Sequence, residues 1–407
     1  MNMKKGILFI FAIVCLIMNI SCKDSKGGTG GVTKEKPSPT KLDGPIEQSG
    51  EPSGIRVYID NSGSMRGYAE GQNAVFISAI SDLKSLKNGE AYFWGAKPQT
   101  PIKGIIGQAL AKNSFAGQDT PFPAIIAQLE HEAASNDALT FIVTDGIIGV
   151  NSKQAQYLKE SLGQIKNDIR DSARVEDGMA ISVFRLQSGY SNKSKNSFYY
   201  THKNVPVKLD SAKQRPFFVI AIGKRPHVQW MIDKINSEGS LSSYKEANSI
   251  TFGLHEHNKV LHFSDKLSFN QDGGTYVLKK KYGEFNLVAD LPDCLVKDLG
   301  ASYLQQHLEV LLNDSKKNIS SSINDNTLRL KCNEIRDISA KANVITVRLK
   351  KIIPDEWFKW SSDDDSNIAK DMMEQQHTFA LTYLLNGLYE ATDDGQMLID
   401  TTIKFTK

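Results

Sequence analysis

The chain has 407 residues, of which 40% are hydrophobic and 23% are charged, and its formal net charge at pH 7 is +3. These values are typical of a globular protein with room for about two domains. Because the charge is nearly balanced and basic residues are not interleaved with aromatic ones, the composition argues against nucleic-acid binding, and we expect no nucleic-acid partner.

The first 22 residues have the pattern of an export signal. Two lysines at positions 4 and 5 precede an apolar segment, residues 7–20, which is too short to cross a bilayer comfortably. The segment ends at Ser21 and Cys22, which resembles bacterial lipoprotein signals, in which the cysteine becomes the acylated N-terminus. The resemblance implies a signal peptide over residues 1–22, lipidation of Cys22 and a location in the bacterial cell envelope, at the outer membrane or the cell surface. A plain secretory signal is the alternative.

Residues 23–54 are rich in Gly, Lys, Ser, Thr and Pro and contain few apolar side chains. Such a segment cannot bury enough apolar surface to fold, so we expect a flexible tether between the membrane and the first domain. Cys294 and Cys332 are the cysteines that follow the signal and the anchor. In an exported protein they form either a disulfide or two buried thiols, and the sequence alone leaves both open.

Ordered structure is expected from Ile55, where a short strand over residues 55–59 leads into Asp60-Asn61-Ser62-Gly63-Ser64. A carboxylate and two hydroxyls therefore stand at every second position directly after a buried strand. These hard oxygen ligands suit Mg²⁺, Mn²⁺ or Ca²⁺ better than Zn²⁺. Gly63 allows the tight turn that would aim both hydroxyls at one point.

Helical and strand patterns alternate over residues 55–240, which predicts an α/β domain with a doubly wound, mostly parallel sheet. A polar insertion with several aromatic residues, 188–213, precedes the last strand. The predicted helices cover residues 74–86, 122–134, 154–173 and 228–236, and the predicted strands cover residues 55–59, 90–95, 139–144, 179–186 and 215–222.

A second acidic turn, Thr144-Asp145-Gly146, follows the apolar run at 139–144. A parallel α/β sheet binds ligands beyond the carboxyl ends of its strands, so we expect Asp145 and the Asp60 turn to meet at one edge. Either turn alone is weak evidence, because acidic turns after strands are common. Together they predict one metal site.

Asp-x-Ser-x-Ser followed by Thr-Asp-Gly resembles the metal-ion-dependent adhesion site of von Willebrand factor A domains, over about residues 55–240. In that family a Thr from an intervening loop completes the site, and Thr120 matches it better than Thr100. The resemblance implies that Mg²⁺, or Mn²⁺ or Ca²⁺, is bound directly by Ser62, Ser64 and Thr120 and partly through water by Asp60 and Asp145. It also implies a protein partner whose acidic side chain completes the coordination.

From about residue 245, short strand patterns separated by turns predict a second, β-rich α+β domain, residues 245–407, with helices over 304–312 and 369–389. His255 and His257, with His262 nearby, form either a metal-binding pair or, as we favour, a solvated strand face. Residues 363–365, three aspartates, form either a cation site or a charged loop that enters the last helix.

These patterns favour a lipid-anchored binding protein that is not an enzyme, because no Gly-x-Ser-x-Gly motif, catalytic triad context or P-loop is present. Two alternatives remain. One is a hydrolase that uses the same ion to activate water, which needs a general base near Asp60. The other is a metal-free scaffold in which residues 245–407 bind the partner.

Overall fold

The structure is a computed structural model. It describes residues 50–71, 75–95, 99–117, 121–149, 154–173, 178–191, 198–209, 214–237, 241–254, 262–263, 269–272, 275–278, 285–291, 301–317, 319–324, 327–332, 342–392 and 397–406. Several predicted features lie outside these ranges: the signal peptide, Cys22, most of the tether, Thr120, His255, His257 and Cys294.

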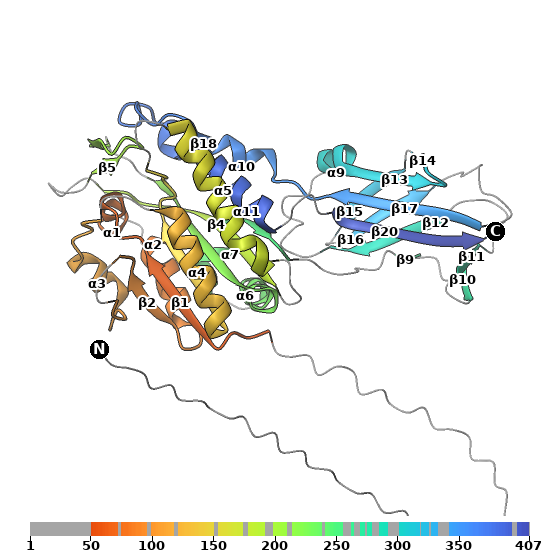
Figure 1. Cartoon of the computed structure of the whole chain (residues 1–407), viewed down its shortest axis with the longest axis horizontal. Helices are drawn as coiled ribbons and strands as arrows, with labels where there is room; N and C mark the ends of the chain where they lie inside the picture. Colours follow the sequence, from red (N-terminus) through yellow and green to blue (C-terminus); the bar gives the residue numbers. More distant parts are fainter. Residues whose placement is uncertain are drawn as a thin grey trace, which may run out of the picture. The chain divides into compact units, whose positions relative to one another are not determined.

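A six-stranded sheet with the order β2-β1-β3-β7-β4-β8 forms the centre of the α/β part of the chain (Figure 1). β1 pairs in parallel with β2 and with β3, whereas the β3–β7, β7–β4 and β4–β8 pairs are antiparallel. The strands are β1 (Gly54–Ile59), β2 (Glu90–Phe93), β3 (Ala138–Thr144), β4 (Met179–Ser188), β7 (Arg215–Lys224) and β8 (Asn248–Phe252).

The predicted α/β class is confirmed, but the expectation of a mostly parallel sheet is wrong for these pairings. A parallel neighbour needs a crossover connection, which is usually a helix. Between β4 and β7 the described residues instead hold a small hairpin of β5 (Tyr199–Tyr200) and β6 (Pro206–Val207), and β7 returns beside β4 in the opposite direction.

Helices cover both faces of this sheet. Thr140 donates from its hydroxyl to the carbonyl of Leu129 in α4, whereas the side chain of Leu139 lies against Gly223, next to His227 of α6. Adjacent strand residues point to opposite faces, so α4 and α6 lie on opposite sides. The helices around the sheet are α1 (Arg66–Ala69), α2 (Val75–Ser85), α3 (Ile106–Lys112), α4 (Phe122–Asn136), α5 (Gln154–Ala173), α6 (Arg225–Ser237) and α7 (Ser242–Lys245), with the 3₁₀ turn η1 (Gly63–Met65).

Residues from the predicted second domain also belong to the core of the α/β part. Trp357, Phe379 and Leu384 are buried in the same hydrophobic cluster as β1 and β3, and a Cβ at Gly387 would lie 3.3 Å from Ile165 of α5. The predicted helix over 369–389 begins only at Leu381. The elements of this segment are α10 (Asp355–Lys359), β18 (Ser361–Ser362), η3 (Glu374–Gln376), β19 (Thr378–Phe379) and α11 (Leu381–Thr392).

A second hydrophobic cluster lies between two mostly antiparallel sheets, β10-β11-β20-β17-β13-β14 and β15-β16-β12-β9. The elements are β9 (His262–Phe263), β10 (Phe269–Asp272), β11 (Thr275–Leu278), β12 (Phe285–Asp290), α9 (Ala301–His307), β13 (Leu308–Leu312), β14 (Ser315–Lys316), β15 (Ser320–Asn324), β16 (Thr327–Cys332), β17 (Ala342–Lys350) and β20 (Met397–Thr406).

Two sequence predictions are settled in this second cluster. The predicted helix over 304–312 is wrong from Leu308 onward, because Val310 and Leu312 are buried with the period of two that a strand requires. Cys332 is a free, buried thiol, and burial raises its pKa to about 12. The sequence left open whether Cys332 pairs with Cys294 or both are buried thiols, and Cys294 is not among the described residues.

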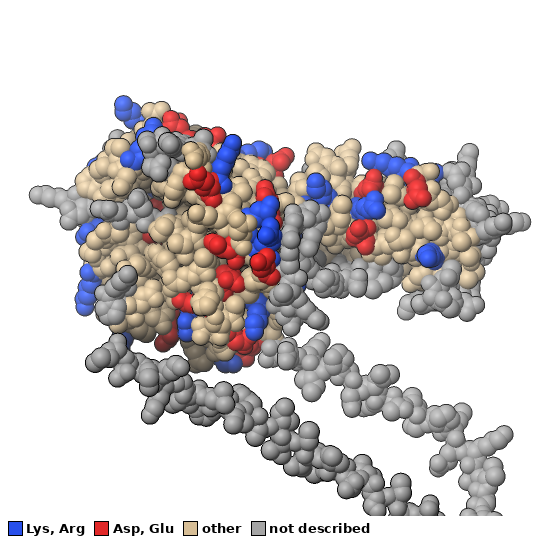
Figure 2. Space-filling view, viewed as in Figure 1, with Lys and Arg blue, Asp and Glu red and all other residues tan. Residues whose placement is uncertain are grey.

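The surface carries both signs of charge. Figure 2 shows Lys and Arg interspersed with Asp and Glu over the face drawn. This distribution agrees with the nearly balanced net charge of +3. None of the described helices has the length and hydropathy of a membrane-spanning helix.

Candidate metal centre

The parallel pairing of β1 with β3 brings the two predicted acidic turns together. Ile59 is in register with Val143, and the amide of Asp60 continues the ladder by donating to the carbonyl of Val143 at 2.9 Å. Asp60 and Asp145 therefore leave neighbouring strands at the same carboxyl edge, as the sequence predicted.

The turn after β1 folds its oxygen atoms inward. The amide of Ser62 donates to Oδ1 of Asp60 at 2.8 Å, and the η1 turn begins with the amide of Met65 donating to the carbonyl of Ser62. The hydroxyls of Ser62 and Ser64 then lie 3.2 Å apart, and the hydroxyl of Ser64 donates to Oδ2 of Asp145. Four of the five predicted ligands converge on one point, and each is buried.

The hydroxyl of Thr144 orients the first carboxylate, a role that the sequence analysis did not assign to it. This hydroxyl donates to Oδ2 of Asp60 at 2.8 Å and accepts from the amide of Gly146 at 3.1 Å. The amide of Ile147 donates to Oδ1 of Asp145 at 3.3 Å. Each carboxylate thus has one oxygen held by a backbone amide, and the other oxygen accepts a hydrogen bond from a hydroxyl.

The fifth predicted ligand, Thr120, lies outside the described residues and remains a prediction. The segment that leads to it does reach the site. Gly117 forms a parallel bridge with Ser62, and its amide donates to the carbonyl of Asn61 at 2.9 Å. A Cβ at Gly117 would lie 2.8 Å from that carbonyl, so a residue without a side chain is needed for this approach. The side chain of Asn113 donates to that of Asn61 at 2.7 Å.

Electrostatics show that the two carboxylates lack a sufficient counter-charge. Burial, followed by the negative charge of Asp60, raises the pKa of Asp145 to about 7, although the hydrogen bonds from Ser64 and Ile147 and the positive charge of Arg215 lower it. Two buried like charges need a proton or a cation between them. Carboxylates and hydroxyls in one place form a hard oxygen set, so the residues present fit Mg²⁺, Mn²⁺ or Ca²⁺.

Arg215 is the basic residue whose positive charge lowers the pKa of Asp145, and the sequence did not indicate this role. It is 2% exposed and its guanidinium stacks over the rings of Tyr199, at 4.5 Å, and Tyr190, at 5.6 Å. In the part of the chain that the structure describes, its Nε and Nη1 have no hydrogen-bond partner. The sequence shows a charged residue at the start of an otherwise apolar strand, but this pattern does not identify the residues that Arg215 contacts.

The metal-free protein is expected to lose stability as the pH rises from about 4 to about 7. Folded Asp145 keeps its proton up to about pH 7, whereas the unfolded carboxyl releases its proton near 3.8. The folded chain therefore binds more protons in this interval, and the free energy of unfolding falls until the pH passes 7. Urea unfolding in EDTA at pH 5 and pH 8 measures the fall, which should be smaller in Asp145→Asn. An equal fall in both proteins would contradict the raised pKa.

The β5–β6 hairpin covers the turn after β1. The hydroxyl of Tyr190 donates to the carbonyl of Ser64 at 3.0 Å, and a Cβ at Gly63 would lie 2.5 Å from the ring of Tyr200. Tyr190 and Tyr199 are buried, so these aromatic residues of the predicted insertion pack on the domain. Tyr190 and the hairpin therefore hold the turn at Asp60–Ser64 in place.

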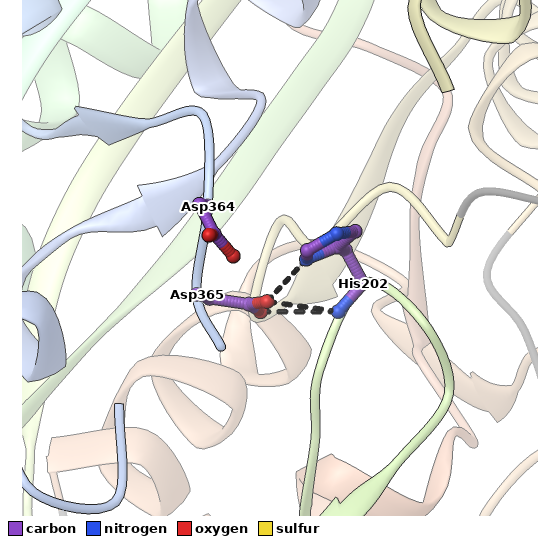
Figure 3. A group of neighbouring side chains, drawn as sticks. All are labelled: His202, Asp364 and Asp365. Atoms are coloured by element: carbon purple, nitrogen blue, oxygen red, sulfur yellow. Dashed lines mark hydrogen bonds and ion pairs between the residues drawn. The ribbon is translucent and has the colours of Figure 1, made fainter. Parts of the chain in front are cut away.

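A second group of ligand-type side chains, His202, Asp364 and Asp365, fastens this hairpin (Figure 3). Both oxygens of Asp365 accept from the amide of His202 at 3.1 Å, one also pairs with Nδ1 of its ring, and the other accepts from the hydroxyl of Tyr199 at 2.8 Å. The His202 ring stacks on Phe379 with centroids 4.2 Å apart. Atoms of the group lie within 4.8 Å of one another, a spacing that would allow a metal ion. Because Asp365 is already satisfied by three protein donor groups, a structural tie is the better interpretation.

No family model matches the sequence, and neither a curated protein nor a solved structure is significantly similar to it. The interpretation of the site therefore rests on its own geometry.

Proposed function

We propose that the chain is a recognition protein whose α/β part is a doubly wound, von Willebrand A-type domain with one divalent-cation site. The cation is Mg²⁺, or Mn²⁺ or Ca²⁺, and an acidic side chain of a protein partner completes its coordination. The protein ligands are Asp60, Ser62, Ser64, Thr120 and Asp145.

The observation that carries the proposal is the convergence of two buried carboxylates and two hydroxyls at the ends of adjacent parallel strands. Ser64 contacts both its neighbour Ser62 and Asp145, which belongs to the other strand. A structural turn needs neither a second carboxylate nor the charge repulsion that raises the pKa of Asp145. Helices on both faces of the sheet and the bridge between Ser62 and Gly117 also support this domain type.

A bound cation would supply a Lewis-acidic position, and the residues of the chain would hold and orient its ligands. Thr144 and the amide of Ser62 orient the carboxylate of Asp60. Ser62 is the most exposed of the four described ligands, at 8%, so a partner would approach a bound cation from its side of the turn. A partner must therefore present its carboxylate on a projecting side chain.

The proposal includes the export pathway. Lipidation of Cys22 would anchor the protein in the bacterial envelope, with residues 23–54 as a tether. The recognition domain would then meet its partner at the outer membrane or the cell surface.

Capture of the partner is expected to require the cation and its ligands. Immobilised wild type in Mg²⁺ should retain a protein from envelope extract that EDTA releases, and Ser62→Ala, which removes a ligand without changing charge, should retain at least tenfold less. The role of the partner's acidic side chain can be tested by amidating the partner's carboxyl groups, which should also prevent capture. Equal capture in EDTA would favour the metal-free scaffold, and metal-dependent turnover of phosphoesters or peptides would favour the hydrolase.

A further inference from the structure

The outer face of the four-stranded sheet β15-β16-β12-β9 carries a pocket that the metal site does not involve. The inner face of this sheet is apolar: Leu287 and Leu330, which are in register, are at most 1% exposed within the second hydrophobic cluster. Because successive strand residues point to opposite faces, the residues that precede and follow Leu287 and Leu330 along their strands point outward. The pocket of about 360 Å³ lies on that outward face.

Strand register places six of the seven described lining residues in two rows across three strands, and the seventh, Ser321, lies between the rows on β15. In the first row Arg329 of β16 lies between Ser322 of β15 and Val288 of β12. Val288 is 7% exposed and forms an apolar floor, whereas Arg329 and Ser322 are exposed. This row therefore offers a guanidinium, a hydroxyl and an apolar surface side by side.

The second row repeats the arrangement two residues along each strand. Lys331 lies between Ser320 and Asn286, so an ammonium group, a hydroxyl and an amide follow the first row. All these residues line the pocket.

The lining suits an anion attached to a hydroxyl-rich molecule. Arg329 forms no ion pair with any residue that the structure describes, so its planar donors are available to a carboxylate or a phosphate. Serine hydroxyls and an asparagine amide both donate and accept, as the hydroxyls of a sugar require. No aromatic residue is among the described lining residues, which argues against a stacked nucleotide base.

We infer that this pocket binds an acidic saccharide, with its carboxylate or phosphate group between Arg329 and Lys331 and its ring over Val288. A volume of about 360 Å³ is within the range of small-molecule sites, roughly 300–1,000 Å³, and accommodates one sugar unit. The site is separate from the cation site and takes a different class of ligand.

Calorimetric titration of the purified protein with glucuronate, glucose 6-phosphate, glucose and inorganic phosphate tests the inference. One or both acidic sugars should bind saturably, at least tenfold more tightly than glucose and than phosphate, and equally in Mg²⁺ and in EDTA. The glucuronate and glucose 6-phosphate arms distinguish a carboxylate from a phosphate ligand. Because saccharide binding should not change in EDTA, the titration tests this pocket whether or not the proposed metal site binds a cation.

Arg329→Gln should weaken binding at least tenfold, and its exposed position should leave the melting temperature unchanged. The control is Arg348→Gln, the same change at a half-exposed strand residue of the other sheet that pairs with Glu309 and Asp400, which should bind like wild type. Absence of saturable binding by both acidic sugars, equal binding of glucose or of bare phosphate, or an unaffected Arg329→Gln variant would each overturn the inference.

Discussion

Asp145→Asn is expected to raise the melting temperature of the metal-free protein at pH 8 and to abolish the further rise that Mg²⁺ or Mn²⁺ produces in wild type. At this pH wild-type Asp145 is ionised beside Asp60 in a buried site, against a pKa of about 7. The amide keeps the shape and the contact with the amide of Ile147 but removes the repulsion. The same change removes one of the proposed cation ligands.

Both effects are large enough to measure. Ionising a group whose pKa is raised by this much costs roughly 4 kcal/mol at pH 8, which Asp145→Asn relieves. A cation at 100 times its Kd stabilises the folded state by about 2.7 kcal/mol. Each kcal/mol moves the midpoint by roughly 2–4 °C in a domain of this size. Calorimetric melts in EDTA and in excess metal therefore separate the two effects.

The charge change itself needs a control. Asp171→Asn makes the same substitution on α5, where the side chain is 92% exposed, and should leave both melts unchanged. Asp60→Asn should also lose the metal-induced rise. A metal-induced rise that persists in Asp145→Asn would show that the cation binds elsewhere. A fall in its metal-free melting temperature would show that hydrogen bonding outweighs the repulsion.

The local part of the site could be predicted from the sequence because strand ends are local features. Strand β3 is apolar at most positions, as expected for a strand buried on both faces. The polar turns after β1 and β3 consist of residues adjacent in the sequence, so they can be identified without knowing the fold. The meeting of Asp60 and Asp145 then required only that β1 and β3 be parallel neighbours.

Other parts of the site depend on contacts between residues far apart in the sequence. Arg215 reaches Tyr199 because β7 returns beside β4, and a strand pattern does not specify direction. Asp365 reaches His202 across 163 positions, in a loop whose composition indicated either a cation site or a charged loop before the last helix, but no partner for Asp365. The segment from Trp357 to Leu384 belongs to the first hydrophobic cluster. Its apolar periodicity predicts a buried face but does not identify the element against which that face packs.

Arg215→Met is expected to lower the stability of the metal-free protein at pH 8 and to enlarge the metal-induced rise, the opposite of Asp145→Asn. Methionine fills a similar space between Tyr190 and Tyr199 without a charge, so the pKa-lowering effect of Arg215 on Asp145 is lost. Arg215 is the smallest of the causes that shift the pKa of Asp145, so we expect a loss below the roughly 3–5 kcal/mol of a broken buried ion pair. The cation then becomes the main counter-charge of the site, and its binding restores more stability than in wild type.

The double variant Arg215→Met/Asp145→Asn tests whether the two charges act on each other. If they do, the amide removes the unpaired carboxylate, and the double variant should be more stable in EDTA than Arg215→Met alone by at least 1 kcal/mol beyond the gain that Asp145→Asn gives in wild type. Chemical unfolding of the four proteins in EDTA at pH 8 completes the cycle. Additive effects would mean that Arg215 stabilises the fold through its packing on Tyr199 and not through Asp145. The enlarged metal response of Arg215→Met should then be absent as well, because the charge of the site would not have changed.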